Sequence, residues 1–445
     1  MGFDMATEAI FSIGYRRTES IEVAQIAIYA CGKCVSRLLR REEREPSEYL
    51  LAPPEELARW LASNWWRIRW EAVPLTDELT ESWRIAHDLR SVGGGYAWPN
   101  LLIWGEDARV AIRVQPDPVG VVGPVQFLAQ AFEMLPAANF ESGVDHFFQQ
   151  IRANISTELR ELIDALYHER VDPELSIWRR LEARLGFDPD RAPDSVMNEL
   201  DDLMNRYKAI DIEEAASAAP GPDSARLLRE EIEHAQGEQA WECNLARIGE
   251  LKSAGWLQQQ LTGRLSQTAP WKQGEMAAIR FRREKGIAGP ISNNLLSELL
   301  EVKPEAFDAL PPQTKSQKLP YALYISGNGS DRILPRSNWP AGRRFEFARA
   351  LGDFIGIEPS NNRELSLAPI APSKTRRQKF QRSFAATFLC PLEELTSYMN
   401  TDQPEEEDIS AAAQHFSVSN WLVESTLMNN GLLPRREFGQ IVEGV

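Results

Sequence analysis

The spacing of hydrophobic residues changes along the chain, and each change predicts a different kind of element. In the first 135 residues, β-branched runs interrupted by turn residues predict two β-hairpins, in VAQIAIYACGKCVSRLL and LLIWGEDARVAIRV. The first should turn at Gly32-Lys33 and the second at Gly105-Glu106-Asp107. Between them, PPEELARWLASNWWRI and ESWRIAHDLR have apolar residues at helical spacing, which predicts two helices. The second helix should run into the glycine turn that follows it.

From residue 136 to 235 the apolar spacing is helical throughout, and acidic residues outnumber basic ones. Charge of this kind usually covers solvated helix faces, and a docking surface for a basic partner is the alternative. Pro, Gly and Ser cluster at the end of EEAASAAPGPDS, residues 213–224, which makes this segment the predicted linker.

After residue 236 the pattern is again mainly helical, with one hairpin predicted in YALYISGNGSDRILP. Helical spacing returns in RRFEFARALGDFI, in RQKFQRSFAATFL and in the last two segments, DISAAAQHF and NWLVESTLMNNGLL. We therefore predict an α+β fold in three parts. They are a mixed N-terminal α/β domain rich in Trp (1–135), an acidic helical region (136–235) and a mainly helical C-terminal domain with a small hairpin or sheet (236–445).

Composition narrows the class of protein. The chain has 445 residues, 43% of them hydrophobic, and a net charge of −16, so general attraction to DNA or to anionic lipid is not expected for the whole molecule. No apolar run reaches the ~18 residues of a membrane helix, and the first residues do not have the order of a signal peptide. Four cysteines in such a long chain are not a disulfide framework. We expect a cytoplasmic protein with no membrane contact and no cofactor.

Two N-terminal features could carry chemistry. Trp65, Trp66 and Trp98, together with Gly94, Gly95 and Tyr96, form a candidate ligand cleft, because glycines let a backbone approach a ligand closely. Packing of the tryptophans into a core is the favoured interpretation. Cys31 and Cys34 form a C-x-x-C, but no second pair stands at zinc-ribbon spacing, so they are interpreted as two buried or turn cysteines.

The segment RRFEFARALGDFI, residues 343–355, decides the functional interpretation. Zinc peptidases carry H-E-x-x-H on such a helix, with two imidazoles one turn apart on the metal and a glutamate that activates water. Here the corresponding positions hold Arg349, Ala350 and Asp353. A guanidinium repels zinc, and alanine cannot accept a proton. Arg349 and Asp353 stand at i and i+4, which predicts an ion pair between them.

Three motifs in order resemble the ImmA/IrrE family of bacterial zinc-dependent peptidases. They are RFEFARALGD (344–353), FAATFLCP (384–391) and the helix-turn-helix-like AAAQHFSVSNWLVESTLMNNGLL (411–433). The resemblance covers the C-terminal ~205 residues and implies a zincin-like domain whose third, acidic metal ligand falls near Gln378 or Phe380. Since both histidines, the glutamate and the acidic ligand are all replaced, it implies a degenerate metallopeptidase without a metal.

The leading hypothesis is therefore a catalytically degenerate, regulatory or partner-binding protein, which by the resemblance would serve phage defence, a toxin–antitoxin pair or mobile-element control. A DNA-binding regulator is the first alternative, because KTRRQKFQR and the terminal helix-turn-helix-like element could contact nucleic acid. The basic residues of that segment are Lys374, Arg376, Arg377, Lys379 and Arg382. The interpretation preferred to nucleic-acid contact is that they pair with Asp353 or Glu346. A peptidase with a rebuilt metal site, using Asp353, Glu358 and a distant histidine, is the second alternative. The partner and the oligomeric state stay open.

Overall fold

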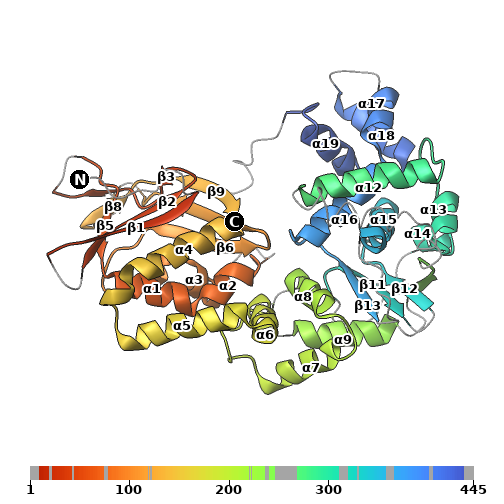
Figure 1. The fold of residues 1–445 in the computed structure, drawn as a ribbon. Helices are drawn as coiled ribbons and strands as arrows, with labels where there is room; N and C mark the ends of the chain where they lie inside the picture. Colours follow the sequence, from red (N-terminus) through yellow and green to blue (C-terminus); the bar gives the residue numbers. More distant parts are fainter. Residues whose placement is uncertain are drawn as a thin grey trace. The chain divides into compact units, whose positions relative to one another are not determined.

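A computed structural model of the chain (Figure 1) describes most of its residues. The described residues are 10–19, 23–42, 45–74, 79–118, 120, 123–219, 221, 223–235, 240–245, 268–309, 319–327, 330–356, 365–399 and 404–434. Helices and several small antiparallel sheets are mixed along the chain, which confirms the predicted α+β class. No helix of this described part is both long enough and apolar enough to cross a membrane.

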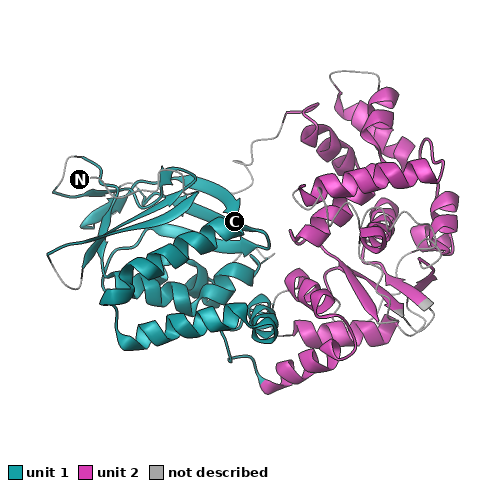
Figure 2. Ribbon diagram, in the orientation of Figure 1, with its two compact units in different colours: residues 1–193, 220–222 teal, residues 194–219, 223–445 magenta. Residues whose placement is uncertain are grey.

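The chain divides into two compact units (Figure 2). Unit 1 is Met1–Pro193 with Pro220–Pro222, and unit 2 is Asp194–Ala219 with Asp223–Val445. The helices of region 136–235 are therefore shared between the units and do not form a unit of their own. The predicted linker is wrong at its start, because residues 213–218 are the second half of a helix that belongs to unit 2.

Unit 1 is built from antiparallel strands with helices packed against them (Figure 1). One sheet contains β1 (Phe11–Arg17), β2 (Ala24–Ala30), β3 (Lys33–Cys34) and β5 (Leu50–Ala52). A second contains β6 (Asn100–Glu106), β7 (Arg109–Gln115) and β9 (Ala131–Pro136), and β4 (Leu38–Arg40) pairs with β8 (Val125–Phe127). The helices are α1 (Pro54–Ser63), α2 (Trp65–Trp70), α3 (Glu81–His87), α4 (Ala137–Ile151), α5 (Thr157–Val171) and α6 (Pro173–Arg184), with 3₁₀ turns at Leu89–Val92 and Arg152–Asn154.

Both predicted hairpins of unit 1 are present, each with its turn shifted slightly. The first turns at Cys31 and Gly32, whose φ angles are 49° and 76°, as a two-residue turn with two left-handed residues requires. The second strand pair continues through Glu106, so its turn comes at Asp107, where φ is 59°. The two cysteines of the C-x-x-C thus lie at a hairpin turn.

Unit 2 contains a four-stranded antiparallel sheet in the order β10 (Trp241–Cys243), β12 (Ser330–Leu334), β11 (Ala322–Gly327) and β13 (Ser366–Ile370). Three helices precede or flank it: α7 (Asp194–Met204), α8 (Ala209–Ala218) and α9 (Ser224–Ala235). The other helices among the described residues are α12 (Pro270–Glu284), α13 (Asn293–Leu300), α14 (Glu305–Asp308), α15 (Pro340–Gly356), α16 (Arg376–Leu389), α17 (Leu392–Met399), α18 (Glu406–Phe416) and α19 (Asn420–Asn429).

The core of unit 2 lies where α15 and α16 meet α12 and the sheet (Figure 1). Helix α12 approaches α16 so closely that a Cβ added at Gly274 would lie 2.4 Å from the carbonyl oxygen of Phe380. Glycine is therefore required at this crossing. The terminal element forms as predicted, with Ser419 capping α19 by accepting a hydrogen bond from the backbone N–H of Leu422.

Candidate functional site

The candidate site is a buried polar cluster between α15 and α16. Arg349 and Asp353 lie one turn apart on α15, and Gln378 and Gln381 lie one turn apart on α16. The side chains of these two pairs meet, because Gln381 hydrogen-bonds to Arg349 and to Asp353. All four residues are buried, from 6% exposed for Arg349 to 0% for the two glutamines. Four polar side chains that converge from two helices are the arrangement in which bundles and zincins hold a metal.

Arg349 is held by neutral oxygens. Its Nη2 donates to the backbone carbonyl of Ala371 at 2.6 Å, to Gln381 Oε1 at 3.1 Å and to Gln378 Oε1. Its Nε is buried and has no hydrogen-bond partner in the part of the chain that the structure describes. The predicted Arg349–Asp353 ion pair is therefore wrong. The i, i+4 spacing permits it, but the guanidinium instead hydrogen-bonds to acceptors on α16 and beside β13.

Asp353 instead pairs with Arg377, which bridges it to a second carboxylate. Arg377 donates to both oxygens of Asp353 at 2.7 Å and to Asp211 Oδ1 at 2.7 Å. Asp211 comes from α8, and its other oxygen accepts the backbone N–H of Leu367 on β13 at 2.9 Å. Asp211 is 1% exposed and Asp353 3%, so Arg377 pairs with two buried carboxylates at once.

Two further residues of the segment 374–382 complete the cluster. Thr375 donates to Glu214 of α8 at 2.6 Å, and Arg382 donates to the backbone carbonyls of Ala371 and Ser373 at 3.2 and 2.9 Å. The charged members are three guanidiniums and three carboxylates, so the cluster is electrically balanced: Arg349, Arg377, Arg382, Asp211, Glu214 and Asp353.

The surroundings move the pKa values of the two central arginines in opposite directions. Burial acts to lower the pKa of Arg377, but the carboxylates of Asp353 and Asp211 outweigh it and raise this pKa. Burial lowers the pKa of Arg349 to about 9, because no carboxylate of the described residues forms an ion pair with it. Both side chains therefore keep their positive charge at neutral pH.

This chemistry does not suit a metal. A cation placed among these helices would meet the charges of Arg349 and Arg377, and Ala350 offers no group that could activate water. Across the described ranges, no group of three His, Cys, Asp or Glu side chains could hold a metal ion. Glu358, named in the rebuilt-site alternative, lies outside the described residues. What the cluster does is tie α8 to α15, α16 and the edge strand β13.

The basic segment is divided between the interior and the surface. Arg377 and Arg382 point into the cluster, whereas Lys374 and Arg376 are exposed and Lys379 is half-buried. The structure therefore brings two of the five candidate contact residues together inside the protein. The other three remain on or near the surface at the start of α16.

The candidate N-terminal cleft is largely core. Trp65 stacks on Phe140 with ring centroids 6.1 Å apart and lies under the guanidinium of Arg170. The indole N–H of Trp66 donates to Glu169, and that of Trp98 to the carbonyl of Gly93. All three tryptophans are buried. Gly94, Gly95 and Tyr96 are exposed with the glycines at positive φ, so the structure separates them from the buried rings.

A second buried charge cluster in unit 1 was missed by sequence reasoning. Glu71 accepts from Arg67 at 2.7 and 3.1 Å and faces His87 Nε2 at 3.0 Å. His87 is 0% exposed, and its Nδ1 lies 2.7 Å from the carbonyl oxygen of Ile103. Arg67 and Glu71 stand at i and i+4, a spacing that could have suggested their pair, but His87 is distant in sequence.

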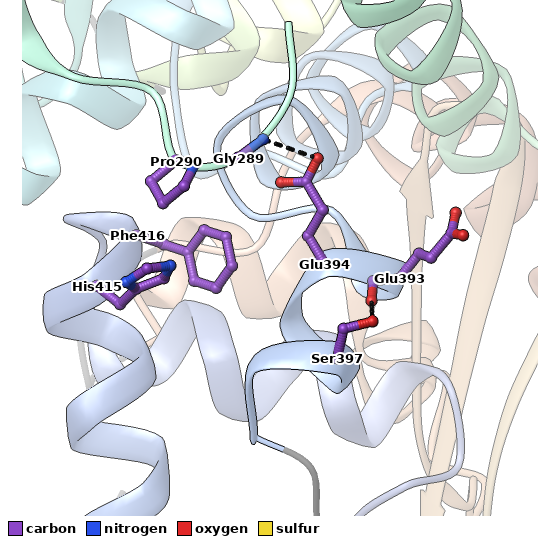
Figure 3. A pocket seen from close by; sticks show the side chains of 7 residues that line it. All are labelled: Gly289, Pro290, Glu393, Glu394, Ser397, His415 and Phe416. Atoms are coloured by element: carbon purple, nitrogen blue, oxygen red, sulfur yellow. Dashed lines mark hydrogen bonds between the residues drawn. The ribbon is translucent and has the colours of Figure 1, made fainter.

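Among the described residues of unit 2, two hollows have linings to which segment 289–294 contributes. The first, about 470 Å³, is lined by residues of α17, of the C-terminal end of α18 and of this segment (Figure 3). Its carboxylates differ, since Glu394 is paired with Arg282 at 2.7 Å, whereas Glu393 is exposed. The second, about 590 Å³, is lined by Arg344 and mostly polar side chains from α13 and α18.

In comparisons with known proteins, no family model, no curated protein and no solved structure matches this chain. The ImmA/IrrE resemblance thus rests on the three motifs alone.

Proposed function

We propose that unit 2 is a binding domain built on an ImmA/IrrE-like metallopeptidase frame that has lost its metal site. In this proposal the protein is not a peptidase and works in the cytoplasm as a regulatory or partner-binding subunit. By the resemblance, its setting would be phage defence, a toxin–antitoxin pair or the control of a mobile element.

One observation carries the proposal: the positions expected to hold metal ligands converge, yet they hold an arginine network. Residue 349, the first histidine position by the resemblance, contacts residue 378, near which it places the acidic ligand. Residue 353, the second histidine position, contacts Gln381, one turn further along the same helix. These positions still lie close together, although they lack the expected metal ligands. This fits a domain that has kept its packing while the residues of its metal site were replaced.

Exposed aromatic residues favour a binding role. Trp271, Trp339 and Trp421 of unit 2 are 54%, 77% and 67% exposed. Tryptophan is enriched in protein interfaces, where its large ring provides much of the binding energy. An acidic unit with three such side chains on its surface is better suited to a protein partner than to DNA.

Zinc content tests the proposed frame. The wild-type chain should purify without zinc, whereas a variant with Arg349→His, Ala350→Glu, Asp353→His and Gln378→Glu should bind about one zinc ion per chain. Elemental analysis measures both. The matched control carries the same four changes except that Arg349 becomes Gln, which removes one ligand and should prevent stoichiometric binding. Stoichiometric zinc in the wild type, lost in Asp353→Asn, would overturn the proposal.

Recovery of bound molecules from the native cell tests the binding role. The tagged full chain should retain a specific protein, and the double change Trp339→Ser and Trp421→Ser should release it. Nucleic acid recovered in its place, and lost when Lys374, Arg376 and Lys379 are neutralised, would favour the DNA-binding alternative. A chain that retains neither would contradict both interpretations.

A further inference from the structure

The second hollow of unit 2, called the α13–α18 groove below, is lined in part by the buried guanidinium of Arg344. Its lining is mostly polar: Ser292, Asn293, Asn294, Asp308, Arg344, Gln414 and Ser417, with Pro340, Ala341, Ala413 and Val418 as the apolar part. At about 590 Å³ the groove is within the size range of small-ligand sites.

Arg344 is the residue that gives this groove its chemistry. It is 2% exposed and donates to the carbonyl oxygens of Ser417, at 3.1 Å, and of Ile291, and to the side-chain oxygen of Asn293. All three acceptors are neutral. Among the described residues no carboxylate forms an ion pair with Arg344. Burial lowers its pKa to about 10, so the charge is present at neutral pH and is balanced by none of the groups it touches.

Neighbouring groups add to the positive charge of this region. Arg343 is 1% exposed and likewise donates to backbone carbonyls, those of Phe307 and Ser337. The first turn of α13 begins at Asn293 on the groove wall, and a helix N-terminus favours anions. Asp308 is the acidic lining residue; it accepts 3.4 Å contacts from the Asn293 amide and acts on Arg344 only at longer range.

Burying a guanidinium without a counter-ion lowers the stability of a fold. Proteins typically keep destabilising features of this kind at functional sites. An arginine has five N–H groups, and the three bonds above leave two of them for a ligand. Amide and hydroxyl groups of Asn294, Gln414 and Ser292 on the same lining can donate further hydrogen bonds to oxygen.

We propose that the α13–α18 groove binds an oxyanion, a carboxylate or a phosphate group, with Arg344 as its charged partner. The ligand enters between the start of α13 and the C-terminal end of α18, and its oxygens replace the counter-ion that Arg344 lacks. The site uses no residue of the buried cluster between α15 and α16. Failure of this proposal would therefore leave the proposed function unaffected, and the reverse also holds.

Calorimetric titration of the full chain at low salt tests this site, with inorganic phosphate as one probe and a blocked peptide with a single glutamate as the other. At least one probe should bind saturably. Binding of the peptide alone would assign the carboxylate of a protein, and binding of phosphate alone would assign a phosphate group.

Two charge variants decide whether binding occurs in this groove without disturbing Arg344. Asp308→Asn removes the acidic lining residue and should tighten binding several-fold, whereas Gln414→Glu adds a negative charge and should weaken it several-fold. Glu406→Gln, at the far end of α18, is the control and should leave affinity unchanged. The proposal is overturned if neither probe binds, or if the two groove variants change affinity no more than the control.

Discussion

Arg377→Met is expected to destabilise unit 2 by about 3–5 kcal/mol, the cost of leaving buried charges without their partner. Asp211 and Asp353 are nearly inaccessible to water and share this one guanidinium at 2.7 Å. Removing it leaves two buried carboxylates without this partner. The effect should appear in urea unfolding, with loss of hydrogen-exchange protection in α8 and α16 identifying the unit concerned.

A matched control and a rescue make this result specific. Arg376→Met makes the same chemical change one residue earlier, at an exposed position, and should cost under about 1 kcal/mol. Adding Asp211→Asn and Asp353→Asn to Arg377→Met should recover much of the loss, because the buried charges are then gone. Equal stability of the two methionine variants would show that the cluster does not hold α8 in place.

The second large effect is expected in unit 1, at Glu71. Glu71→Gln should cost about 3 kcal/mol at pH 7, because Arg67 and His87 lose the carboxylate that both contact. Burial acts to raise the pKa of Glu71, but hydrogen bonds from His87 and Arg67 outweigh it and lower this pKa below its ordinary value of 4.5.

A lowered carboxyl pKa fixes the sign of the pH dependence. The stabilisation by Glu71 is fully present above pH 4.5, the ordinary carboxyl value, and is lost as the pH falls toward the lower folded value. Unfolding of unit 1 can be followed by fluorescence, since seven tryptophans lie between Trp60 and Trp104. The wild type should lose more stability than Glu71→Gln on acidification. Glu81→Gln, at an exposed position, should lose as much stability on acidification as the wild type. If Glu71→Gln also loses as much as the wild type, Glu71 is not the source of the pH dependence.

Sequence reasoning succeeded where structure depends on neighbouring residues. The hairpin around Cys31 and the cap at Ser419 follow from turn and capping preferences over a few positions, and both are present. The α+β class followed from the same local periodicities. The pairing of Arg349 failed because the i, i+4 rule compares only residues on one helix, whereas the acceptors lie on α16 and beside β13.

The partners from α8 were the hardest part to predict. An acidic helical region is usually solvated, and this general rule places residues such as Asp211 and Glu214 at the surface. A signal was present in AIDIEEAASA, since both acids stand among alanines and isoleucines with few other polar residues to cover the helix. That pattern predicts burial of the helix, but it cannot identify Arg377 as the partner, 166 residues away from Asp211.

The bridge from Asp211 through Arg377 to Asp353 also constrains how the chain can diverge. Replacing Arg377 alone leaves both carboxylates without this partner, and replacing either carboxylate alone removes one of the two partners of Arg377. We therefore expect single changes at these positions to be disfavoured. Paired changes that keep the charge balanced are the permitted route. Positions 211, 353 and 377 should therefore covary among descendants of this sequence. Substitutions in the acidic helix α8 would then depend on substitutions in α15 and α16 of the C-terminal domain.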